Sequence, residues 1–153
     1  MSEDTVVTFT PDEISRAAQS NATSLALGAM AFCKDHHLPI TELVSAWGRR
    51  FAPLWAKEIT ALDMAEGAAL NWVSVGSRLS ALSGDASHGK AVITGWPSEA
   101  SLAAFGLSQA EADILWSNFG PIAESHGLSY HWQRQGDEVT MTFTKKLDPP
   151  AHG

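Results

Sequence analysis

Apolar residues recur at three- and four-residue steps over the first half of the chain, which predicts helices. A Thr10–Glu13 capping box with Pro11 inside it predicts a helix start, and a short strand is expected just before it, over residues 6–10. This helix should end near His36-His37, before Pro39. Its apolar stripe is made of Ile14, Ala18, Ala22, Leu25, Ala29 and Phe32.

Two more helical stretches follow. The second is expected to begin at a Thr41 cap, and Pro53 should kink or interrupt it; its stripe is made of Leu43, Val44, Trp47, Phe51, Leu54, Trp55 and Ile59. A third stripe runs over residues 65–82 and contains Trp72, Leu79 and Leu82. Residues 83–85 read as a loop.

After that loop the pattern changes. Residues 90–94 predict a strand that Pro97 stops, and Ser98 begins a short helix that ends at Gly106. Ser108 and Glu111 form a second capping box, and the helix that it starts should run to Gly127. Apolar and polar residues then alternate over 128–133 and 139–144, around a turn at residues 134–137. This alternation predicts a β-hairpin.

The predicted fold class is therefore α+β, with N-terminal helices packed on an antiparallel sheet and a C-terminal β-α-α-β-β unit that ends in the hairpin. We expect a single domain over residues 1–146 and a flexible, proline-rich tail over 147–153. A cavity between the helices and the sheet would offer a place for a ligand.

Composition narrows the range of partners. Of the 153 residues 44% are hydrophobic and 18% charged, as in a folded protein, and the formal net charge is −7. The negative charge argues against nucleic acid and against an anionic membrane surface. No apolar run of about 18 residues and no signal-peptide layout is found. The single Cys33 excludes an internal disulfide framework. We therefore expect a cytoplasmic protein.

Aromatic residues are the main candidates for ligand binding, since the chain has six tryptophans. Those on helical stripes, such as Trp47 and Trp55, fit either a core or a helix-packed homodimer interface. Alternatively, indole rings line a pocket for a flat organic molecule. The candidate ligand-binding residues are Trp96, Trp132, Tyr130, Trp116, Trp72, Asn71 and Arg50.

Metal chemistry has weaker support. Cys33 and His36 would share a helix face, with His37 beside them, but a zinc site needs further ligands that the sequence does not identify. Histidines in a last helical turn also suit the helix dipole. We expect no metal and no cofactor. Gly-rich phosphate loops, GxSxG, HExxH and paired catalytic carboxylate motifs are absent from the sequence.

Residues 95–144 resemble the L-2-amino-thiazoline-4-carboxylic acid hydrolase-like family, which is similar in layout to the vinyl-reductase type of small-molecule-binding domain. Phe105-Gly106 matches the end of that family's short helix, and Gly136-Asp137 matches its hairpin. The family's cysteines are missing, because Trp96, Asp113 and Val139 or Thr140 stand at their places.

The resemblance implies a small-molecule-binding protein that has diverged from these hydrolases. It leaves two alternatives, a protein that only binds its ligand and an enzyme that catalyses a metal-independent hydrolytic or ring-opening step. If the step is retained, Asp113 or His131 would be the base that activates water. Asp113 otherwise lies on a solvated face or at the rim of the pocket. The alternative function is a non-catalytic accessory subunit, whose Trp-rich helices bind a partner protein.

Overall fold

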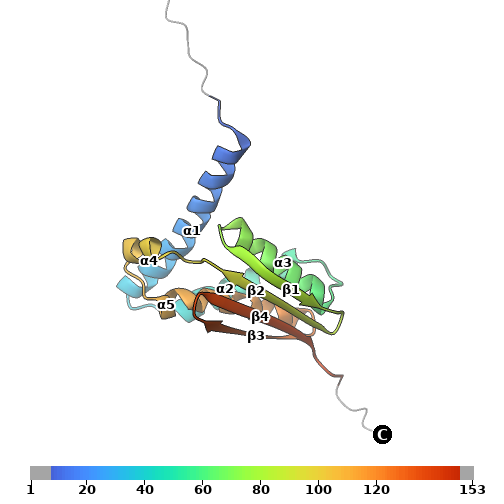
Figure 1. Ribbon diagram of the computed structural model, residues 1–153. Helices are drawn as coiled ribbons and strands as arrows, with labels where there is room; N and C mark the ends of the chain where they lie inside the picture. The colour runs from blue at the N-terminus through green and yellow to red at the C-terminus, as the bar shows by residue number, and fades with distance from the viewer. Residues whose placement is uncertain (1–7, 149–153) are drawn as a thin grey trace, which may run out of the picture.

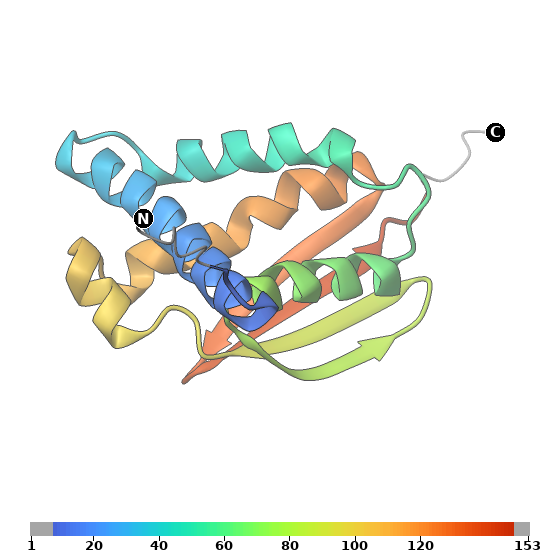
Figure 2. The same ribbon diagram turned by 90° about the horizontal axis from the view of Figure 1, so that it is seen from above.

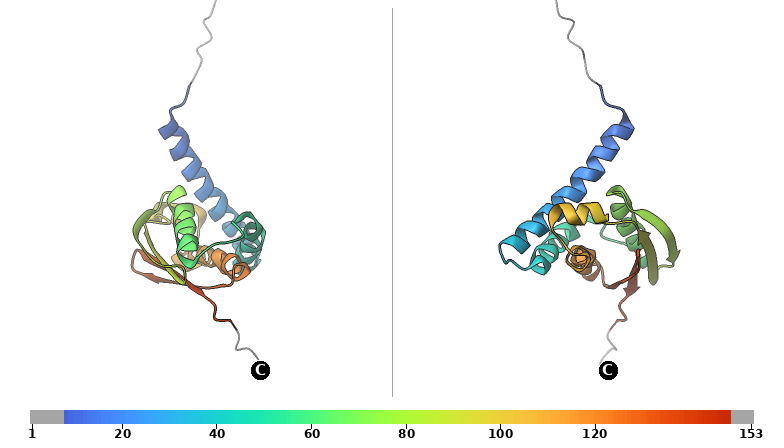
Figure 3. Two further views of the ribbon diagram at one scale, coloured as in Figure 1. Left: turned by 90° about the vertical axis from the view of Figure 1, so that its right-hand side faces the viewer. Right: turned by 60° about the vertical axis from the view of Figure 1, so that its left-hand side comes forward.

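The computed structural model describes residues 8–148 and shows an α+β fold, as predicted. A four-stranded antiparallel sheet has the order β1-β2-β4-β3. The helices lie on one side of this sheet (Figure 2), and α1 projects beyond the rest of the molecule (Figures 1 and 3). The elements are α1 (Pro11–Asp35), α2 (Ile40–Phe51), η1 (Ala52–Leu54), α3 (Ala61–Ser74), β1 (Arg78–Gly84), β2 (His88–Thr94), α4 (Glu99–Phe105), α5 (Gln109–Asp113), η2 (Ile114–Asn118), α6 (Phe119–Ser125), β3 (Leu128–Gln135) and β4 (Glu138–Lys145).

Helix α1 begins at the predicted capping box, in which Thr10 and Glu13 bond each other's backbone N–H groups. It ends at Asp35, close to the predicted position. The predicted strand over 6–10 falls mostly outside the described residues, and residues 8–10 have no regular structure. The tail predicted for 147–153 is described only to residue 148.

The cap predicted for α2 is wrong. The helix starts at Ile40, directly after Pro39, and no side chain caps it. Pro53 does interrupt the helix as expected, since α2 stops at Phe51 and continues as the short 3₁₀ helix η1. A capping box that the sequence analysis missed begins α3, where Thr60 and Asp63 bond each other's backbone.

The third predicted helix is too long, because its last part forms strand β1. Helix α3 ends at Ser74, and Gly76 turns the chain with a φ of 99°. A register shift in β1 between Leu79 and Ala81 then adds one residue to the strand. Leu79 and Leu82 therefore pair with Ile93 and Ala91 on the same face. Because of the bulge, Leu79 and Leu82 lie on one face of the strand although they are three residues apart, which is the spacing of a helix. This spacing led to the prediction of a helix over these residues.

The C-terminal hairpin is confirmed, with β3 and β4 joined at Gly136, whose φ is 62°. Ser98 caps α4 and Gly106 ends it, also as predicted. The helix expected over 108–127 is instead three pieces, α5, η2 and α6, of which the first starts at the predicted Ser108 cap.

The core lies between the sheet and the helices that cover it. The inner sheet face contributes Ala91, Ile93, Val139, Met141 and Phe143, all of which are buried. Helix α3 lies across β2, and α6 lies across β3. None of the helices within residues 8–148 is long and apolar enough to cross a membrane.

Candidate functional site

A cleft of about 640 Å³ opens beside the core, between α1, α3 and the η2–α6 segment. The loop after η1 closes one side of it with Trp55 and Ile59. Most of the lining is apolar, which suits an organic ligand. The wall from α1 is made of small side chains, Ala22, Thr23 and Ala26.

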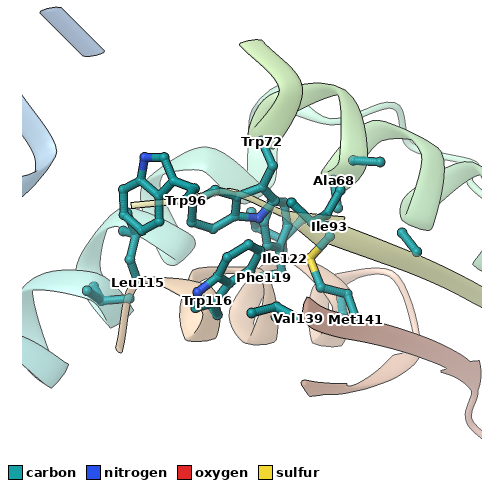
Figure 4. Packing of buried hydrophobic residues seen from close by; sticks show 14 of the residues in the cluster. Ala68, Trp72, Ile93, Trp96, Leu115, Trp116, Phe119, Ile122, Val139 and Met141 are labelled. Carbon is teal, nitrogen blue, oxygen red and sulfur yellow. The ribbon is translucent and has the colours of Figure 1, made fainter. Parts of the chain in front are cut away.

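Three indole rings lie together in the core beside the cleft (Figure 4). The rings of Trp72 and Trp116 stack with centroids 3.7 Å apart and an interplanar angle of 24°. Trp96 is tilted against Trp72 at 4.7 Å. Trp72 and Trp96 line the cleft, whereas Trp116 lies behind Trp72 as part of the core. All three residues are pocket candidates from the sequence, and the fold brings them together from α3, the β2–α4 loop and η2.

Thr23 of α1 connects two walls of the cleft. Its hydroxyl accepts a hydrogen bond from Trp96 Nε1 at 3.3 Å and donates to the carbonyl of Val75 at 3.2 Å. This bridge fixes the Trp96 indole against α1 and against the end of α3. The orientation of a cleft-lining ring is therefore set by hydrogen bonding as well as by packing.

The polar groups of the cleft are few. Two buried atoms, Trp72 Nε1 and Asn118 Oδ1, have no hydrogen-bond partner among residues 8–148. Asp63 is the only charged residue in the described lining. Backbone and side-chain hydrogen bonds from Thr60 lower the pKa of Asp63, so its carboxylate is committed to the cap of α3. The described lining therefore offers no cation to an anionic ligand.

Asp113 is buried and forms a structural ion pair (Figure 1 shows α5, which it ends). Arg134 contacts it through Nε–Oδ2 and Nη2–Oδ1, both at 2.7 Å. Gln109 Nε2 and Trp116 Nε1 also donate to Oδ1, at 2.9 and 3.2 Å. Arg134 further donates to the carbonyl of Trp96 at 3.3 Å. Asp113 thus joins α5, η2 and β3, and it is not among the residues that line the cleft.

His131, the other candidate base, is exposed on β3. Because side chains alternate along a strand, it lies on the outer sheet face, opposite to its neighbours Tyr130 and Trp132. The structure therefore brings neither His131 nor Asp113 to the cleft, and it does not bring them to each other.

Of the remaining candidate ligand-binding residues, one lines the cleft and the others do not. Asn71 lines the cleft, where its amide donates to the carbonyl of Gly67. Arg50 is exposed at the end of α2 and lies outside the lining, although Phe51 beside it belongs to the lining.

Tyr130 and Trp132 pack against the core and tie the hairpin to η2. The Tyr130 hydroxyl donates to the carbonyl of Trp116 at 2.7 Å, and Trp132 Nε1 donates to Ser117 Oγ at 3.0 Å. Burial raises the pKa of Tyr130 well above its usual range, so the phenol stays protonated. Neither residue lines the cleft.

Some lining residues were not among the sequence candidates, notably Trp55, Gly67 and Phe119. Trp55 lies against α3 at Gly67, where an added Cβ would come within 2.6 Å of the Trp55 ring. The edge of the Trp55 ring also meets Phe119, with centroids 6.1 Å apart. Trp55 was visible in the sequence as part of an apolar stripe, but only the fold shows that it faces a cleft.

The cysteine and histidines considered for metal binding lie at the end of α1. Cys33 is buried, and the Nδ1 atom of His36 lies 2.9 Å from the carbonyl of Phe32. Within residues 8–148 no three His, Cys, Asp or Glu side chains are grouped closely enough to hold a metal ion.

Comparisons with protein-family models, with curated proteins and with solved structures give no match for this chain. The resemblance of residues 95–144 to the hydrolase-like family therefore stays a prediction.

Proposed function

We propose that this protein binds a compact, flat and largely uncharged organic molecule in the cleft between α1, α3 and η2–α6. The observation that carries the proposal is an apolar cleft of about 640 Å³ with three indole rings, those of Trp55, Trp72 and Trp96, in its wall. Cavities of about 300–1,000 Å³ with apolar linings and few polar groups are typical of small-molecule sites. Trp72 and Trp96 offer flat apolar surfaces on which a planar ligand can stack.

The described lining offers no free charge, since its one carboxylate, that of Asp63, caps α3, and this favours an uncharged ligand. Trp72 Nε1 is a donor without a partner, and Asn118 Oδ1 is an acceptor without one. Leaving such groups unpaired in a buried place costs about 1–3 kcal/mol each. Both atoms are sealed from the cleft, so a ligand could bond either group and recover part of this cost only if the Trp72 or Asn118 side chain turned toward it. The proposal is for binding and not for hydrolysis, because Asp113 and His131 lie outside the cleft.

The test uses Nile red, a neutral, flat and fluorescent molecule, as the probe. We expect saturable binding with a rise in probe fluorescence and quenching of the intrinsic tryptophan emission. Asn71→Trp places a large ring at an exposed position that lines the cleft, and it should weaken binding at least tenfold. Native mass spectrometry of protein taken from cell extract would then report the mass of the natural ligand.

Glu66→Trp is the matched control, since Glu66 is exposed on the same helix but is absent from the lining. The control should bind Nile red like the unmodified protein. Equal loss of binding in both variants, or no saturable binding by the unmodified protein, would contradict the proposal.

A second function, docking of a partner protein at the same place, is favoured by the exposed apolar side chains of the lining. Leu54 and Leu70 are 78% and 69% exposed, and Phe51 is 45% exposed. An apolar surface of this kind also occurs at protein interfaces. If the protein is an accessory subunit, it should not bind Nile red in the cleft, and it should co-purify with its partner. Leu70→Glu should then abolish the association with that partner.

A further inference from the structure

The loop after η1 forms one wall of the cleft, and a single side chain holds it. Trp55, Ala56 and Ile59 of this loop line the cleft. Across residues 56–59, the only hydrogen bond within the described part of the chain joins the carbonyl oxygen of Ala56 to the Nε2 atom of His126, at 2.8 Å. The position of this wall therefore depends on His126.

His126 joins the loop to a second wall of the cleft. It follows α6 directly as its C-cap, and its Nδ1 atom lies 2.8 Å from the carbonyl oxygen of Ile122, which also lines the cleft. This carbonyl belongs to the last turn of the helix, where carbonyl groups lack a helical N–H partner. The Ser125 hydroxyl donates to it as well, at 2.7 Å. One imidazole ring thus contacts a carbonyl oxygen on each of two walls.

The charge of the imidazole decides how many of these contacts are hydrogen bonds. A carbonyl oxygen only accepts, so each contact needs a proton on the facing ring nitrogen. The imidazolium donates to both carbonyls, whereas the neutral ring has one N–H and turns a lone pair toward the other oxygen. The Ser125 hydroxyl, 3.0 Å from Nδ1, can donate to the neutral ring, but it then leaves the Ile122 carbonyl. Loss of the ring proton therefore removes one hydrogen bond in every arrangement.

We propose that His126 is a proton-controlled clamp on the cleft. In its imidazolium form it holds the loop of residues 55–60 against α6, and the cleft then binds its ligand more tightly. The clamp regulates the ligand site proposed above, so its effect on affinity rests on that proposed function. Because the clamped form is the protonated one, its stabilisation is present in acid and is lost as pH rises. Histidine is the side chain that ordinarily changes its charge between about pH 5 and pH 8.

No charged side chain of the surrounding elements bonds the ring. Those nearest in the chain to its contacts are Lys57 and Glu58 in the loop, Glu124 in α6 and Lys146 after β4. Helix α2 and strand β3, which pack against α6, add Glu42, Arg49, Arg50, His131 and Arg134. Within residues 8–148 none of these side chains forms an ion pair or a hydrogen bond with His126. Carboxyl, amino and guanidinium groups keep their charge between about pH 5.5 and pH 8 in ordinary surroundings, whereas imidazole does not.

The first experiment measures the affinity for Nile red at about pH 5.5 and pH 8. We expect the unmodified protein to bind about three- to tenfold more tightly at the lower pH, which is the ratio that one net hydrogen bond gives. His126→Gln has a polar side chain without a titrating proton, so its affinity should be the same at both pH values. His131→Gln is the matched control and should keep the ratio, because His131 is exposed on the outer face of β3 and lies outside the lining.

Three results would overturn the clamp. Equal affinity of the unmodified protein at the two pH values would do so and would leave the cleft as a binding site. A ratio that persists in His126→Gln, or that disappears in His131→Gln, would assign the pH dependence to another group.

The second experiment needs no ligand, so it tests the clamp even if the unmodified protein does not bind Nile red. Nitrogen-15 NMR of the imidazole shows which ring nitrogens carry a proton, and order parameters of the backbone amides report how rigid the loop is. We expect both nitrogens of His126 to be protonated at about pH 5.5, and the order parameters of residues 56–59 to fall as the ring loses a proton. In His126→Gln these order parameters should not change with pH. A loop that is equally rigid with the charged and the neutral ring would overturn the clamp.

Discussion

At the scale of single residues, Asp113 shows how a candidate catalytic group can be a structural one. In the sequence, a carboxylate near aromatic residues fits a catalytic base at the rim of a pocket as well as it fits a structural group. Here Arg134, Gln109 and Trp116 all donate to it. Its lone pairs are used to join three elements, and little remains with which to bind water.

The role of the pair can be measured. Arg134→Met leaves the Asp113 carboxylate buried without its cation, which should lower the free energy of unfolding by about 3 kcal/mol. Adding Asp113→Leu should restore much of this loss, because no uncompensated charge then remains. Urea denaturation of the two single variants and the double variant gives the coupling energy. Additive losses would show that the two side chains do not act as a pair.

The Ser108–Glu111 cap predicts a pH dependence. The backbone N–H of Ser108, followed by Lys34, lowers the pKa of Glu111 from its ordinary value of 4.5. A lowered pKa in the folded state means that the stabilisation is present above the unfolded pKa and is lost as pH falls through the folded pKa.

Glu111→Gln should therefore lower the free energy of unfolding at pH 7 by about 0.5–1 kcal/mol, and with it the melting temperature. At about pH 2 the substitution should change the melting temperature little. Thermal unfolding of both proteins at the two pH values is the measurement. An equal difference at both values would show that the charge of Glu111 is not the cause.

At the scale of elements, close backbone approach fixes how α2 sits on the η2–α6 segment. A Cβ at Gly48 would collide with the carbonyl oxygen of Asn118 and would come within 3.0 Å of Pro121 Cγ. The position is buried, and its nearest neighbour is a backbone atom, which cannot turn aside as the end of a flexible side chain can. Glycine is required here by space rather than by its backbone angles.

We expect Gly48→Ala to destabilise the protein by about 1–3 kcal/mol through overpacking. Gly120→Ala is the contrasting variant, since no heavy atom lies within 4 Å of a Cβ at Gly120. That helical position should gain about 0.5–1 kcal/mol from the better propensity of alanine. Chemical denaturation gives the change in the free energy of unfolding for each variant. Changes of the same sign in both variants would contradict overpacking at Gly48.

The sequence predicted the local features well and the long-range ones poorly. Caps at Thr10 and Ser108 and the turn at Gly136 depend on a few neighbouring residues, and all are present. Strand β1 was missed because its bulge copies helical spacing.

The residues of the candidate site could be predicted only in part, because their contacts are long-range as well. Trp72, Trp96 and Asn71 were named from chemistry and do line the cleft. The sequence did not show that Arg134 binds Asp113 or that Trp55 lies on Gly67. Each of these contacts joins segments that are distant in the chain, and no local pattern encodes how such segments are placed.

At the scale of the whole molecule, the structure consists of a packed body and a helix that extends from it. Nearly every α3 residue that faces the sheet is buried, including Ala61, Met64 and Ala68. Residues 11–18 of α1 are all exposed. Such a difference in packing implies a difference in local stability within one chain.

Hydrogen exchange should show this difference. In dilute protein, the amides over residues 15–20 should exchange much faster than those over 65–72, because opening the start of α1 breaks no buried contact. Exchange of α1 that is as slow as that of α3 would contradict this expectation.

The stack of Trp72 on Trp116 also gives the protein an optical signature. Two indole transitions at a centroid distance of 3.7 Å couple with each other, and Trp96 beside them adds a third. The coupled rings should give a paired positive and negative band in the circular dichroism spectrum, which replacement of Trp72 or Trp116 by leucine removes and replacement of Trp96 by leucine only changes. Folding and ligand entry can therefore be followed in the unlabelled protein.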